Sequence, residues 1–176
     1  VGLLVNDGTT TSNATVSQAD FTPSANTWYN ILGTWDGTNI KLYINGVLKK
    51  TTAFSASNLD TNTVNVLIGD SSASGTYFLN GKISNTAVWD TDLSSTQVTE
   101  VYNQGVPSNL NTFSGTAPVA WWQLGSNSSF NTNWTCLDEI GTNNAVSANM
   151  TNSDIVDGVG YSASGLGTSS IDIKGD

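Results

Sequence analysis

The chain has 176 residues, of which 38% are hydrophobic and 11% are charged, and 14 acidic residues against five lysines give a net charge of −9. A surface of that sign repels phosphate, which argues against nucleic acid and anionic membranes as partners. The chain contains no histidine, which excludes serine–histidine–aspartate catalysis and histidine-based zinc sites. No apolar run is long enough to insert into a membrane.

The first part of the chain is predicted to form strands separated by turns. Asp36-Gly37 and Asn45-Gly46 are the strongest turn signals, because asparagine and glycine tolerate the positive φ of tight hairpins. Period-two alternation on both sides of them indicates the middle of an antiparallel sheet. The predicted strands are residues 1–5, 15–21, 28–34, 40–44 and 47–54.

Three further strands and one helix are predicted downstream. Residues 64–69 are largely apolar and β-branched, which is typical of a buried strand. Residues 77–79 and 82–89 follow as strands. A helix is predicted through residues 93–102, capped by Asp92 or Ser94. It ends at Asn103-Gln104-Gly105.

The remainder is less regular. Residues 106–118 are predicted to be a linker, and residues 119–124 form a strand-like run. The chain after Asp157 is rich in glycine and serine and is the part least expected to form regular structure. Cys136 is the single cysteine, so we interpret it as a small buried hydrophobe. Because the chain begins at Val1 inside a strand-like segment, we expect it to be a fragment of a longer polypeptide.

Four motifs follow one another along the chain: Trp28 to Gly46, Leu67-Ile68-Gly69, Phe78 to Trp89, and Asp92 to Gly105. Together they resemble the laminin-G-like, concanavalin-A-like jelly-roll family. The resemblance covers roughly residues 1–105 and matches the latter two-thirds of that family, with the opening strands missing before Val1. A jelly roll followed by a Trp-Trp segment also resembles surface proteins of marine tailed phages.

The resemblance implies an all-β fold: an antiparallel β-sandwich (jelly roll) with one short helix and a C-terminal extension. The predicted domains are a sandwich over residues 1–105, a linker over 106–118 and a C-terminal segment over 119–176. Residues 119–124 look like an opening strand placed after the domain. The C-terminal segment is therefore either a second, partial module or an extension that packs on the sandwich.

Family members bind carbohydrate, proteins or calcium through loops at one edge of the sandwich. Calcium takes about six to eight oxygen ligands, and four aspartates lie at strand ends where loops could converge. The better interpretation is that these residues form turns, because aspartate hydrogen-bonds its own backbone there. No cofactor is certain, and calcium is the one these carboxylates could hold. They are Asp7, Asp36, Asp60 and Asp70.

Aromatic residues offer a second kind of site. Tyr77 and Trp134 lie beside polar loops and are the candidates for stacking on a sugar ring. Core packing is the favoured alternative for each. A glycosidase needs two carboxylates facing one cleft, whereas Asp138 and Glu139 are adjacent and would point to opposite faces of a strand.

These observations predict a non-catalytic structural or adhesion module on an extracellular or virion surface, such as a capsid, tail or appendage protein. Its predicted partner is a glycan or protein on a cell or particle surface, and we expect a homo-oligomer or part of a larger assembly. The alternative is a soluble calcium-dependent lectin domain.

Overall fold

A computed structural model describes residues 1–176 except 62, 64, 71–77, 126, 158–168 and 174–176. Its regular elements are mostly strands in antiparallel sheets, and α1 (Ser95–Tyr102) is the one α-helix among the residues described. This confirms the predicted fold class. Contacts divide the chain into two compact units: unit 1 comprises Val1–Val64 and Thr91–Gly105, and unit 2 comprises Asn65–Asp90 and Val106–Asp176.

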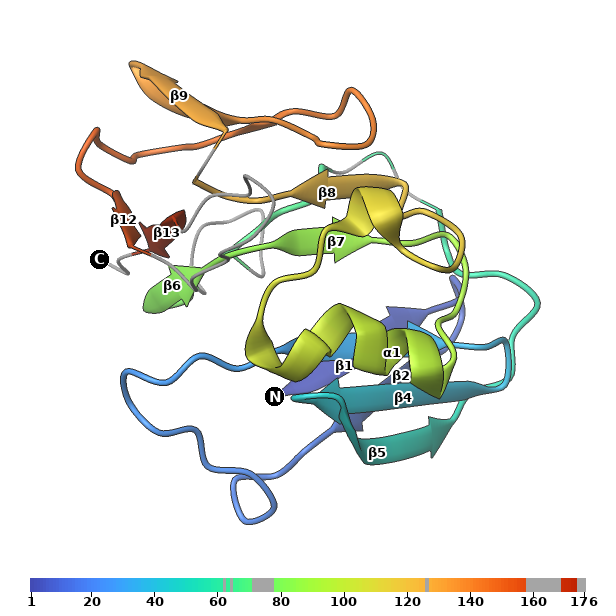
Figure 1. The fold of residues 1–176 in the computed structure, drawn as a ribbon. Helices are drawn as coiled ribbons and strands as arrows, with labels where there is room; N and C mark the ends of the chain where they lie inside the picture. The colour runs from blue at the N-terminus through green and yellow to red at the C-terminus, as the bar shows by residue number, and fades with distance from the viewer. Residues whose placement is uncertain (62, 64, 71–77, 126, 158–168, 174–176) are drawn as a thin grey trace. The chain divides into compact units, whose positions relative to one another are not determined.

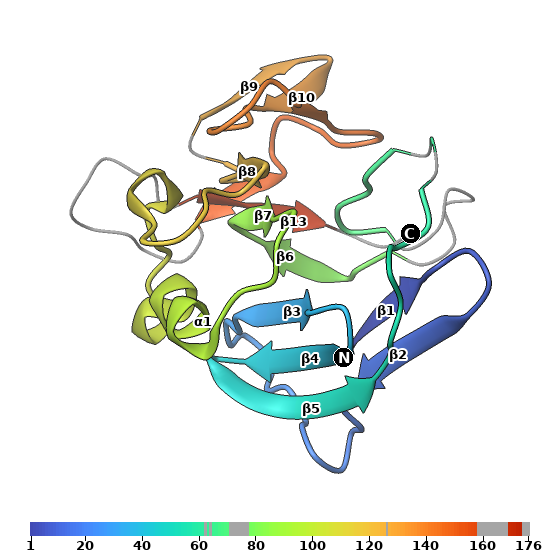
Figure 2. The same cartoon turned by 90° about the vertical axis from the view of Figure 1, so that its right-hand side faces the viewer.

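Unit 1 consists of a hairpin packed against a three-stranded sheet. The hairpin joins β1 to β2 and the sheet has the order β3-β4-β5, all antiparallel (Figure 2). Inward residues of both parts form one core, in which Ile40 and Ala14 are fully buried. The strands are β1 (Gly2–Asn6), β2 (Thr11–Thr15), β3 (Ile31–Trp35), β4 (Asn39–Ile44) and β5 (Val47–Ala53).

The two predicted hairpin turns are confirmed. Asn45 and Gly46 join β4 to β5 with φ values of 50° and 72°, as a two-residue turn with both central residues left-handed requires. Gly37 has φ 88° in the turn between β3 and β4. Glycine at position 46 is also needed for space, because a Cβ there would lie 2.8 Å from the Tyr102 ring. Figures 1 and 2 show α1, which carries Tyr102, next to this end of β4.

Helix α1 begins at a capping box formed by Ser94, one of the two predicted caps. The Ser94 hydroxyl accepts from the Gln97 N–H at 3.3 Å, and the Ser94 N–H donates to the Gln97 side chain at 2.8 Å. Ser94, rather than Asp92, is therefore the N-cap. Val98 is fully buried, and the helix ends at Asn103 in the left-handed conformation.

Unit 2 contains three small sheets. One pairs β7 with β8, the second has the order β12-β13-β6, and the third has the order β11-β10-β9. Trp122, Leu124 and Cys136 lie in its core, and burial raises the pKa of the Cys136 thiol. The prediction of a buried cysteine is thus confirmed. The strands are β6 (Gly81–Ile83), β7 (Thr86–Val88), β8 (Ala120–Trp122), β9 (Ser128–Asn131), β10 (Asn133–Cys136), β11 (Ala145–Val146), β12 (Ile155–Asp157) and β13 (Ser169–Ile173).

Two predicted strands are wrong, and of the one predicted over 77–79 the described residues contain only the isolated bridge of Phe78. The second strand ends at Thr15, where a predicted one began, because Ser17 turns the chain: its hydroxyl donates to Asp20 at 2.6 Å and its carbonyl accepts from Phe21 at 3.0 Å. Residues 65–69 form no strand, and Val66 is 70% exposed. Only Ile68 of this run packs against the unit 2 core, so the apolar run does not mark a buried strand.

Two further differences concern the second half of the chain. The strand predicted over 82–89 is divided into β6 and β7 by Asn85, whose φ of 55° interrupts the extended backbone. The tail does contain regular structure, since β13 pairs with both β12 and β6. The predicted domain boundaries stay a prediction, because contacts within one chain do not show which segments fold independently.

Candidate binding site at the loop end of unit 1

Three loops meet at the end of the unit 1 sheet that is opposite the β4–β5 turn, and we call them the loop end. They are residues 7–10 between β1 and β2, residues 36–38 between β3 and β4, and residues 54–60 after β5 (Figure 2). The third loop connects the other two. Phe54 N–H donates to the Thr38 carbonyl at 2.8 Å, and Asp60 N–H donates to the Asn6 carbonyl at 2.8 Å.

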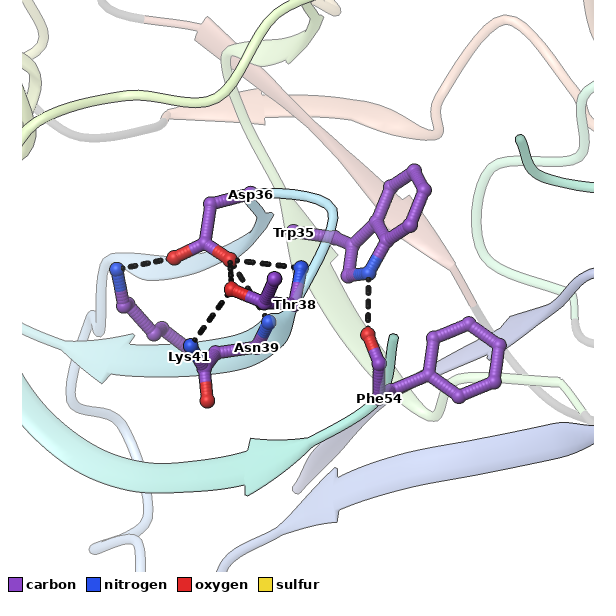
Figure 3. Close-up of polar contacts among 6 residues, drawn as sticks. All are labelled: Trp35, Asp36, Thr38, Asn39, Lys41 and Phe54. Carbon is purple, nitrogen blue, oxygen red and sulfur yellow. Dashed lines mark hydrogen bonds and ion pairs between the residues drawn. The ribbon is translucent and has the colours of Figure 1, made fainter. Parts of the chain in front are cut away.

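Asp36 organises the β3–β4 turn, as Figure 3 shows. Its Oδ1 accepts from the Thr38 N–H at 3.0 Å, the Thr38 hydroxyl at 2.8 Å and the Asn39 N–H at 2.7 Å. Its Oδ2 pairs with the Lys41 ammonium at 2.7 Å. Lys41 first, and then the Thr38 and Asn39 donors, hold the pKa of the Asp36 carboxyl well below its usual range, and Asp36 raises the pKa of Lys41.

The same turn is anchored to the start of the loop after β5 by an aromatic pair. The Trp35 indole N–H donates to the Phe54 carbonyl at 3.0 Å, and the two rings lie 6.1 Å apart between centroids (Figure 3). Both rings pack into the unit 1 core, Phe54 as one of its buried members. The turn is therefore held from its polar side by Asp36 and from its apolar side by Trp35.

Asp7 plays the corresponding part in the β1–β2 turn. Its Oδ1 accepts from the Thr9 N–H at 2.9 Å and the Thr10 N–H at 2.7 Å, and these amides, Thr10 first, lower its pKa. Asp60 lies alongside, since a Cβ on Gly8 would be 3.4 Å from the Asp60 Oδ1. The structure thus brings Asp7 and Asp60 to one corner of the loop end.

The four predicted carboxylates have different surroundings. Asp70 belongs to unit 2, where it bridges to Phe78, and the Asp36 carboxylate is occupied by a lysine cation. Among the residues described, no three acidic, cysteine or histidine side chains are grouped as metal ligands. Calcium takes about six to eight oxygens, and the Asp36 carboxylate is already paired with Lys41. Binding of calcium by the other carboxylates stays a prediction. The turn-forming interpretation accounts for the hydrogen bonds of Asp7 and Asp36.

The two aromatic candidates have different outcomes. Tyr77 lies outside the described residues. Trp134 is only 8% exposed: its indole N–H donates to the Thr151 carbonyl at 2.7 Å, and its ring packs against Phe130 at 5.3 Å. Its environment in this structure is one of packing, and a role in sugar stacking stays a prediction.

Exposed polar residues of the third loop were not among the predicted site residues. Ser55, Ser57 and Asn58 are exposed on the segment that links the two aspartate turns. Together with Thr9 and Thr38, which are also exposed, they give the loop end a set of hydroxyl and amide groups. The signal available in the sequence was the run of small polar residues that directly follows the strand over 47–54.

A family model described as the concanavalin A-like lectin/glucanases superfamily, of the laminin G type, matches residues 2–99. No curated protein and no solved structure matches the chain. Within the described part of the chain, no helix is both long and apolar enough to cross a membrane.

Proposed function

The chain belongs to the concanavalin A-like lectin/glucanase superfamily, and on that premise we propose that it is a non-catalytic module that binds a glycan or a protein through the loop end of unit 1. The observation that carries the proposal is the convergence of three polar loops at one end of the sheet. Family membership supports binding of a carbohydrate or protein ligand in general. The loop end is the surface to which we assign this binding.

The chemistry of the loop end favours a neutral, hydroxyl-rich ligand. Thr9, Ser55 and Ser57 present exposed hydroxyl groups, and Asn58 presents a side-chain amide that both donates and accepts. The backbone beneath them is fixed by Asp7 and Asp36, so little conformational entropy would be lost on binding. The net charge of −9 disfavours phosphate-bearing ligands.

The test is a glycan array followed by calorimetry on the best ligand. Replacing Ser57 and Asn58 by alanine is expected to lower affinity about tenfold or more, because each lost hydrogen bond costs about 1 kcal/mol. Thr27→Ala is the matched control, since Thr27 is exposed on the segment before β3, at the opposite end of the sheet. Equal losses in the control and in the loop variants would refute the loop end as the site.

A calcium-dependent lectin is the second candidate, and the same assay distinguishes it. We expect binding to survive chelation, because the lysine on Asp36 stands where a cation would be needed. Complete loss of binding in EDTA, restored by calcium, would favour the lectin and would place its metal among residues other than Asp36.

We further propose that the module works on an extracellular or virion surface as part of a homo-oligomer or larger assembly. The support is the resemblance to tailed-phage surface proteins together with a composition rich in uncharged polar residues. Sedimentation of the native material is the test. A mass of many copies supports the proposal, and a mass of one or two chains supports a secreted lectin instead.

A further inference from the structure

Unit 2 is built from two separate pieces of the chain. Residues 65–90 contribute β6 and β7, and residues 106–176 contribute the remaining strands, from β8 to β13. The residues between them, 91–105, carry α1 and belong to unit 1. The two pieces of unit 2 are therefore joined to each other only by the contacts between them and by a connection that runs through the other unit.

Strand pairing forms the first set of contacts between the pieces. β7 pairs antiparallel with β8, in a register that sets Ala87 opposite Trp121. β6 pairs with β13, which sets Ile83 opposite Ile171. Strands of three residues that lose these partners would expose unpaired amides and carbonyls along their edges.

Additional hydrogen bonds continue both ends of the β7–β8 ladder. The Asn85 N–H donates to the Gln123 carbonyl at 3.2 Å, and the Val119 N–H donates to the Val88 carbonyl at 2.8 Å. Beyond them, the Trp89 indole N–H donates to the Thr116 carbonyl at 3.2 Å. The ladder thus extends past the three paired residues on each side.

Apolar packing joins the same pieces. The Trp89 ring lies 5.8 Å from the Phe113 ring. Ile68 and Ile83, from the first piece, pack against the core cluster that contains Trp122, which belongs to the second. The contact between the pieces therefore combines backbone pairing with a shared hydrophobic core.

The second piece holds β8 in place from its other edge. The buried Asp138 carboxylate accepts from the Trp121 N–H at 3.0 Å, the Ile140 N–H at 3.1 Å and the Asn143 N–H at 3.1 Å. The Glu139 N–H donates to the Trp121 carbonyl at 2.8 Å. β8 is consequently presented to β7 as a strand already fixed along one side.

We propose that β6 and β7 form an interaction surface for residues 106–176, and that this segment stays bound to the rest of the chain when the covalent connection is cut. The C-terminal segment acts as a strand donor, and residues 1–105 act as the acceptor. This inference is independent of any ligand at the loop end.

The experiment cuts the full-length chain after it has folded. A protease recognition sequence inserted between Gly105 and Val106, in the exposed stretch 103–106, allows cleavage there. Denaturing electrophoresis verifies the cut, and gel filtration at micromolar concentration shows whether the two pieces elute together. We expect one species with the elution volume of the uncut protein and unchanged tryptophan fluorescence.

Variants then test the β7–β8 contact. Trp121→Ala in the cut protein is expected to separate the pieces, because this ring is fully buried in the donor segment. Phe130→Ala is the matched control: it also removes an aromatic ring from the donor, but the ring is 37% exposed on β9, away from the acceptor strands. The control is expected to elute as one species.

If Trp121→Ala does not fold, a less disruptive variant tests the same contact between β7 and β8. Asp138→Asn keeps the shape of the side chain and is expected to speed the dissociation of the cut protein about tenfold, since weaker hydrogen bonds then hold β8. Separation of the unmodified pieces under native conditions, or their aggregation after cleavage, would overturn the proposal. So would an unchanged dissociation rate in Asp138→Asn.

Discussion

The two units of this chain are built by opposite routes. In unit 1 every sheet pairing joins strands that follow one another along the chain: β1 with β2, β3 with β4, and β4 with β5. In unit 2 the pairings of β7 with β8 and of β6 with β13 join strands that lie on either side of helix α1 in the sequence. Short turns join the paired strands of unit 1. Unit 2 cannot form until strands that are far apart in the sequence have come together.

This difference predicts which unit forms first and which is the more resistant to denaturant. Closing a short hairpin costs little chain entropy, whereas a long loop costs more and slows folding. We therefore expect unit 1 to form first and unit 2 to open at lower denaturant.

Replacing Trp121 by alanine is expected to have the largest effect, a loss of about 3–5 kcal/mol in the free energy of unfolding, because a fully buried ring leaves a cavity. Urea titration followed by amide exchange should show lost protection in unit 2, with β4 still protected. Ile40→Ala, at a fully buried position of unit 1, should show the reverse pattern. Equal loss of protection in both units would mean that they unfold together, which would contradict the expectation that unit 2 opens at lower denaturant.

Replacing Asp138 by asparagine should cost about 2 kcal/mol at neutral pH, the value typical of hydrogen bonds to a charged group. Burial raises the pKa of Asp138, but the amides of Trp121, Gly141, Ile140 and Asn143 outweigh it and the net shift is downward. A depressed pKa stabilises the fold above the ordinary value of 3.8, and this contribution is lost as the pH falls through the folded pKa.

Acid titration of unit 2 measures this contribution. The wild-type protein should lose stability in unit 2 below about pH 4, and Asp138→Asn should show a weaker loss because it lacks the titrating group. Asp36 also has a depressed pKa, so Asp36→Asn serves as the control in unit 1. Identical acid profiles for wild type and Asp138→Asn would contradict the assignment.

Replacing Gly46 by alanine should destabilise unit 1 by about 1–3 kcal/mol, because the new Cβ meets the Tyr102 ring and the residue keeps a positive φ. Gly37→Ala is the matched control, since Gly37 has φ 88° and nothing within 4 Å of its would-be Cβ. The difference between the two unfolding free energies isolates the clash with the helix. If they agree, α1 does not press on the β4–β5 turn.

Replacing Ser94 by alanine is expected to have the smallest effect, about 1 kcal/mol, through the loss of one capping hydrogen bond of α1. Ser95→Ala, one residue later, is the control and should change stability by less. Thermal unfolding monitored by circular dichroism is sufficient. A loss as large as that for Trp121→Ala would show that α1 stabilises more than unit 1.

Features that are determined locally are predicted correctly from the sequence. The turns at Asp36-Gly37 and Asn45-Gly46, the strands beside them and the Ser94 cap all follow from residues close together in the chain. The turn-forming interpretation of Asp36 likewise needed only its neighbours. These features lie in unit 1.

Features that depend on distant partners are not predicted correctly from the sequence. The composition of Ser169–Ile173 does not reveal that this segment pairs with β6, and the apolar character of 65–69 does not reveal that these residues form no strand. The open choice for residues 119–124 had the same cause. Only the structure shows that their β8 pairs with β7, within the region that the family model matches.

The burial of Cys136 makes opening of the unit 2 core measurable by a chemical reaction. Its thiol is 3% exposed and its pKa is raised, so a thiol reagent cannot react with it while the core is closed. The chain has no second cysteine to confuse the signal. The rate at which such a reagent modifies Cys136 therefore reports how often the core of unit 2 opens.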